Sequence, residues 1–89
     1  MIYKNTNELN DVQKAILKDL LESGYIGKKH TPIEKVQKGF PKHLRGEVKK
    51  AVKKLIRMGC IREYPTSHGI DVTIPVHAVG KIKEILGVR

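Results

Sequence analysis

The chain has 89 residues, which is enough for one domain with a single hydrophobic core. Its formal net charge of +9 at pH 7 attracts polyanions, and no apolar run approaches the roughly 18 residues that a membrane span needs. Cys60 is the only cysteine, so no disulfide can form within the chain. Residues 1–10 lack the basic end and apolar run of a secretory signal. We therefore expect a cytoplasmic protein without membrane contact, whose core consists mostly of Ile, Leu and Val.

Residues 1–7 are expected to form a flexible arm, and the first helix is expected over residues 10–23. Asn10 can cap this helix, Gln13 stands where a capping box needs an amide, and Gly24 ends it. A broad apolar stripe at helical spacing runs through the segment and consists of Leu9, Val12, Ile16, Leu17, Leu20 and Leu21.

A very short strand near Lys29–Thr31 and a second helix are expected next. Thr31 is expected to cap this helix, with Pro32 at its first position and Glu34 completing a Thr-x-x-Glu capping box. Gly39 and Pro41 end the helix after about two turns.

The third helix, expected over residues 42–58, carries the strongest charge signal. On a helical wheel its aliphatic side chains gather on one side and its basic side chains on the other. The basic side holds Lys42, Lys49, Lys50, Lys53, Lys54 and Arg57, and Arg45 borders the apolar side. Glu47 is the one acid of this helix, whereas the first helix mixes acids with bases. Because such a face repels itself, the pattern favours contact with a polyanion over a merely solvated surface.

Gly46 lies in the first turns of this helix, on its basic side. A helical glycine costs roughly 1 kcal/mol relative to alanine, so its presence needs a reason. Gly46 would be explained either by the close approach of another molecule's backbone or by close packing against the second helix.

After Gly59 the apolar pattern changes to a period of two. The segments CIREY and IDVTI are expected to form strands joined by the loop PTSHG, with Ile70, Val72 and Ile74 on one buried face. Cys60 is expected to open the first strand as a buried thiol. The segment VHAVGKIKEIL then predicts a helix over residues 76–86. Its aliphatic residues, with Leu17 and Leu21, either close the core of a monomer or pair in a homodimer.

The region from Asn10 to Leu86 resembles a winged helix-turn-helix domain and is most similar to the small, largely uncharacterised archaeal winged-helix proteins. The segments that carry the resemblance are HTPIEKV, FPKHLRGEVKKAVKKLIRMGCI and YPTSHGIDVTI. The expected fold class is therefore α+β and mainly helical. It comprises a three-helix core (10–59), a two-stranded β-hairpin wing (60–75) and a C-terminal helix (76–86). The resemblance implies a helix in the major groove of DNA and a wing along the backbone or minor groove.

The residues expected to contact nucleic acid lie on the basic helix and on the wing. They are Lys42, His43, Arg45, Lys49, Lys50, Lys53 and Arg57 on the helix, and Arg62, Ser67 and His68 on the wing. Most are lysines, which suit phosphates better than base edges. We expect a transcriptional regulator or small chromatin-type factor that binds double-stranded DNA electrostatically and with weak selectivity.

Two other functions stay open. The chain could be a protein-interaction module whose basic helix meets an acidic protein, or an RNA-binding, ribosome-associated protein. The four histidines and Cys60 show no metal-ligand spacing, and no catalytic or nucleotide-binding motif is present. We therefore expect no enzymatic activity, no cofactor and no bound metal.

Overall fold

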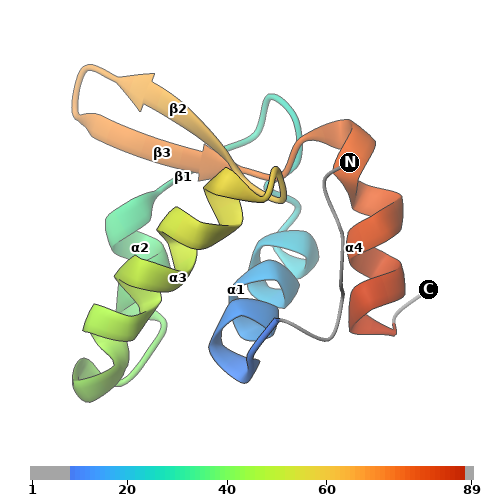
Figure 1. Ribbon diagram of the computed structural model, residues 1–89. Helices are drawn as coiled ribbons and strands as arrows, with labels where there is room; N and C mark the ends of the chain where they lie inside the picture. The colour runs from blue at the N-terminus through green and yellow to red at the C-terminus, as the bar shows by residue number, and fades with distance from the viewer. Residues whose placement is uncertain (1–8, 88–89) are drawn as a thin grey trace.

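The computed structural model describes residues 9–87, which form four α-helices and a three-stranded antiparallel sheet (Figure 1). The expected arm, residues 1–7, lies outside the described residues. Helix α1 (Asp11–Glu22) begins with the predicted capping box. The Asn10 side chain accepts from the Gln13 N–H at 2.8 Å, and the Gln13 side chain accepts from the Asn10 N–H at 2.9 Å. The chain leaves the helix at Gly24, whose φ of +77° favours glycine.

The prediction that Thr31 caps the second helix is wrong. Thr31 belongs to strand β1 (Thr31–Pro32), which pairs with strand β3 (Gly69–Thr73), and Thr31 lies opposite Val72. Pro32 keeps a non-helical ψ of 141°, so helix α2 (Ile33–Lys38) begins one residue later and has no side-chain cap. The pairing with β3 buries the Thr31 side chain in the sheet and displaces the capping box. Helix α2 ends before Gly39, as predicted.

The basic helix begins later than predicted, because its expected first turn is a separate 3₁₀ helix, η2 (Lys42–Leu44). Helix α3 (Arg45–Arg57) follows directly. Its buried side is the predicted aliphatic stripe, formed by Val48, Ala51, Val52 and Leu55. This stripe packs against α1 and α2, so the opposite side of α3 faces outward (Figure 1).

The hairpin joins strand β2 (Arg62–Thr66) to β3 through a turn at residues 67–68, which is shorter than the predicted loop. Cys60 is buried but precedes β2 instead of opening it, because its N–H bonds to the Leu55 carbonyl at the end of α3. Ile70 was expected to be buried, yet 41% of its surface is exposed. The hairpin extends beyond the helices, so the buried face reaches only Val72 and Ile74 (Figure 1).

The last helix packs beside α1 and closes the core (Figure 1). A 3₁₀ helix, η3 (Val76–Ala78), leads into α4 (Val79–Leu86). Ile82 of α4 and Leu17 of α1 are both fully buried within the single chain. The described part of the chain is thus α+β and mainly helical, as the sequence predicts. None of its helices has the length and apolar content to cross a membrane.

Candidate nucleic-acid interface

Helix α3 presents a continuous basic surface on the side opposite its buried stripe. At 100° per residue, Gly46, Lys50, Lys53 and Arg57 fall along the middle of this side, flanked by Lys49 and Lys54. All of these residues are exposed. We call Lys49, Lys50, Lys53, Lys54 and Arg57 the basic face of α3.

The charges of the basic face are not neutralised within the described residues. The one contact between a basic side chain and a carboxylate within ion-pair distance in those residues joins His30 to Asp71, and neither residue belongs to α3. Glu47 lies in the first turn of α3, where a carboxylate interacts favourably with the helix N-terminus. The basic face therefore has a large excess of positive charge with no ion-pair partner among the described residues, although Glu63 lines a hollow with Lys53 and Arg57. A phosphate backbone would be a favourable partner for it.

The glycine of this face has no packing role among residues 9–87. Apart from its two chain neighbours and the nearby backbone of α3 itself, a Cβ atom added at Gly46 would meet no heavy atom of the described residues within 4 Å. The alternative that Gly46 allows close packing against α2 is therefore wrong. Glycine has a lower helix propensity than alanine, and no tertiary contact of the described chain at this position compensates for the difference.

The expected contact residues around the start of α3 differ in their surroundings. Lys42 and His43 are exposed on the 3₁₀ turn η2 that precedes the helix. Arg45 is half-buried, and its Nε atom is covered without a hydrogen-bond partner among the described residues. Arg45 thus differs from the freely exposed cations of the basic face.

The hairpin residues expected to contact nucleic acid fall into two separate places. Arg62 is exposed at the start of β2, whereas Ser67 and His68 are exposed at the turn, at the opposite end of the strand. At this turn the Thr66 hydroxyl donates to the Gly69 carbonyl at 3.0 Å and accepts from the His68 N–H at 3.2 Å.

Arg62 is linked to the basic face through two adjoining hollows. One is lined by Lys53, Ile56, Arg57 and Glu63. The next shares Ile56 and Glu63 with it and adds Arg62 and His77. The structure therefore brings the C-terminal end of the basic face close to Arg62, while it leaves Ser67 and His68 apart.

A third group of side chains was missed by sequence reasoning. His30 Nδ1 lies 2.5 Å from Asp71 Oδ2, and the His30 ring stacks on Tyr64 with centroids 4.0 Å apart. Asp71 and Tyr64 lie directly opposite each other in the β2–β3 register. His30 and Asp71 are separated by 41 positions, so their contact cannot be predicted from any local pattern in the sequence.

No family model, curated protein or solved structure matches this chain. Within residues 9–87, no cluster of three or more His, Cys, Asp or Glu side chains is placed to hold a metal ion. The features of the described chain that bear on its function are therefore the basic face, Gly46 and the hairpin.

Proposed function

We propose that this chain is a winged helix-turn-helix protein that binds duplex DNA through the basic face of α3, as a transcriptional regulator or small chromatin-type factor. The order of elements supports this assignment, because two short connected helices, α2 and α3, are followed directly by a β-hairpin. In this arrangement α3 takes the place of the helix that enters the major groove, and the hairpin takes the place of the wing.

The observation that carries the proposal is the uncompensated charge of the basic face. Five exposed cations lie on one side of α3 and none has a carboxylate partner among the described residues. Duplex DNA releases condensed counterions when such cations neutralise its phosphates, and this release drives binding. The open space above Gly46 adds support, because it lets a backbone approach α3 closely just N-terminal to this face, on the same side of the helix.

The composition of the face indicates weak sequence selectivity. Four of its five residues are lysines, which act as point charges on phosphates. Arg57 at the C-terminal end of α3, and Arg45 and His43 at its N-terminal end, are the few groups able to bond the acceptor edge of guanine. About four to six phosphate contacts from α3 would give a log–log salt slope of about −4 to −5.

The test is fluorescence anisotropy with a labelled random duplex of about 20 base pairs, titrated at several salt concentrations. The variant is Lys49→Glu plus Lys53→Glu, two exposed positions one helical turn apart on the basic face. The matched control is Lys14→Glu plus Lys18→Glu, which has the same spacing and charge change on α1, at a hollow between α1 and α4.

The proposal expects the first variant to lose most of its duplex affinity and the control to lose much less. Equal losses would show that only net charge matters, and unchanged binding by the first variant would show that α3 is not the DNA-binding surface. A structured RNA is titrated alongside. Tighter binding to the RNA, or duplex binding indifferent to salt, would favour the RNA-binding or protein-interaction function instead.

A further inference from the structure

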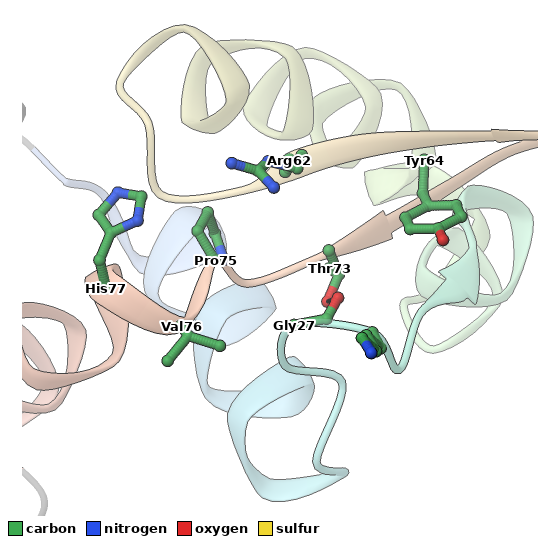
Figure 2. A pocket seen from close by; sticks show the side chains of 8 residues that line it. Gly27, Arg62, Tyr64, Thr73, Pro75, Val76 and His77 are labelled. Carbon is green, nitrogen blue, oxygen red and sulfur yellow. Dashed lines mark hydrogen bonds between the residues drawn. The ribbon is translucent and has the colours of Figure 1, made fainter.

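A hollow of about 530 Å³ lies on the outer face of the sheet, where the hairpin meets the loop before β1 and the start of η3. Figure 2 shows Arg62 and Tyr64 of β2 on one side of it and Gly27 on the other, with Val76 and His77 at its end. Lys28 also lines it, next to Gly27. The hollow contains none of the basic face of α3, so the proposed function does not account for it.

The walls of this hollow are fixed by hydrogen bonds between distant parts of the chain. The Thr73 hydroxyl lies 3.1 Å from the Gly27 carbonyl and 2.8 Å from the Lys29 carbonyl, and it can donate to either. The Gly27 N–H donates to the Ile74 carbonyl at 2.9 Å. Gly27 itself has a φ of +65°, and an added Cβ would stand only 3.0 Å from Val76 Cγ2. The loop is thus held against the sheet, and the hollow is formed before any ligand arrives.

Tyr64 supplies a flat surface whose orientation is fixed by a stacked neighbour that does not line the hollow. His30 stacks on its ring with an interplanar angle of 18°, and Asp71 holds the His30 ring through Nδ1. Among residues 9–87, His30 is the one ring in contact with Tyr64. Tyr64 still lines the hollow with 41% of its surface exposed. A second flat group could therefore stack there at little conformational cost.

The remaining lining combines exposed apolar surface with positive charge. Val76 is 69% exposed, and the buried Pro75 beside it adds to the apolar lining. Lys28, Arg62 and His77 are exposed at the edge, and none of the eight described residues that line the hollow is acidic. A nucleotide fits this combination, because its base is flat and its phosphate is anionic. An acidic peptide would engage the cations but would leave the aromatic surface unused.

The hollow also connects to the basic face of α3. It shares Arg62, Pro75 and His77 with the neighbouring hollow. That hollow in turn shares Ile56 and Glu63 with the one beside Lys53 and Arg57. A strand leaving a duplex at the C-terminal end of α3 would have a continuous route past Arg62 to Tyr64.

We propose that the outer face of the hairpin holds a binding site for an unpaired nucleotide, with its base stacked on Tyr64 and its phosphates at Lys28 and Arg62. The protein then prefers a duplex that carries a single-stranded extension over a blunt duplex. The nucleotide site stands on its own residues, and only the preference for the extended duplex rests on the proposed function.

The site is tested with an oligothymidylate of about eight nucleotides and an abasic oligomer of the same length, both followed by fluorescence anisotropy. Because stacking on an aromatic side chain strengthens binding appreciably, the oligothymidylate should bind at least about fivefold more tightly than the abasic oligomer. Tyr64→Ala should remove this difference, and Tyr64→Phe should keep it.

Ile70→Ala is the matched control for Tyr64→Ala. Ile70 is also 41% exposed and lies on the hairpin, but its side chain belongs to the opposite face of the sheet. Thermal unfolding by circular dichroism checks that both variants fold. Lys28→Ala plus Arg62→Ala should weaken the binding of both oligomers while retaining the difference between them.

Equal affinities of the wild type for the two oligomers would overturn the proposal. So would a Tyr64→Ala variant that still discriminates between them, or an Ile70→Ala variant that loses discrimination to the same extent. An oligoglutamate that binds as tightly as the oligothymidylate and depends equally on Lys28 and Arg62 would assign the site to acidic peptides instead.

The failure of this site and the failure of the proposed function are distinguishable. The Lys49→Glu plus Lys53→Glu variant should lose blunt-duplex binding and keep the oligothymidylate preference. If the wild type fails to bind blunt duplex but shows that preference, the nucleotide site holds and the proposed function does not. If blunt duplex binds and an added thymidylate extension brings no tighter binding, the preference for extended duplexes is wrong.

Discussion

Replacing Gly46 with alanine should stabilise the protein and weaken DNA binding at the same time. Gly46 is the second residue of α3, and an added Cβ meets no described heavy atom within 4 Å other than its chain neighbours and the backbone of its own helix. The substitution therefore has no steric cost in the free protein and reduces the conformational freedom of the unfolded chain. We expect about 0.4–1 kcal/mol of added stability, or a rise of about 2–8 °C in Tm for a domain of this size.

Gly46→Ala should lower the affinity for duplex DNA, although it raises stability, if a DNA backbone approaches α3 at Gly46. The new methyl group would then stand in the contact, and inserting a methyl group into a well-packed contact typically costs about 1–3 kcal/mol. Duplex affinity should fall by about 5- to 150-fold. A variant that is more stable yet binds less tightly cannot owe its loss of binding to unfolding.

Gly80 provides a closely matched control, because it is the second residue of α4 and an added Cβ there likewise meets only its chain neighbours and the backbone of its own helix within 4 Å. Gly80→Ala should raise Tm similarly and leave duplex affinity unchanged. Circular dichroism melts and anisotropy titrations measure the two quantities. A Gly46→Ala variant that binds duplex like the wild type would refute a close approach at this position. A Gly80→Ala variant with an equal loss of affinity would show that the loss is not specific to α3.

Two further predictions concern the edge of the interface and the core. Glu63 is the one acid lining the hollow beside Lys53 and Arg57, so Glu63→Gln should strengthen duplex binding about two- to fivefold at low salt. This gain should fade at high salt, and no gain in a low-salt titration would place Glu63 outside the DNA contact. Ile82 of α4 is fully buried, so Ile82→Ala should lower the free energy of unfolding by about 2–5 kcal/mol in urea denaturation. A loss below about 1 kcal/mol would mean that α4 contributes little to the core.

The features predicted correctly from the sequence depend on residues close together in the chain. The capping box of Asn10 and Gln13 spans three positions, and Gly24 ends α1 through its own backbone conformation. The separation of charge and apolarity on α3 follows from the helical period alone. Because these features involve no residue distant in the chain, they can be predicted from the sequence alone.

The wrong predictions arose where a distant segment competed with a local signal. Thr31 and Glu34 have the spacing of a capping box, yet Thr31 pairs with Val72 in the sheet instead. Ile70 continues the alternation of Val72 and Ile74, but alternation does not show how far the helices extend beneath a hairpin. In both cases the tertiary environment overrode a pattern that was locally valid.

The sequence by itself determined the α+β class, the four helices, the hairpin and the accumulation of cations on one side of α3. Each follows from periodicity, capping or turn chemistry within a few residues. Only the tertiary structure showed that Gly46 faces open space, that Arg62 adjoins Lys53 and Arg57, and that His30, Asp71 and Tyr64 meet. The open space at Gly46 depends on how α3 packs against α1 and α2, whereas the meeting of His30, Asp71 and Tyr64 depends on which strands pair and on how the loop before β1 is held against the sheet. Hydrogen bonds across about half the chain fix both, and no local pattern encodes them.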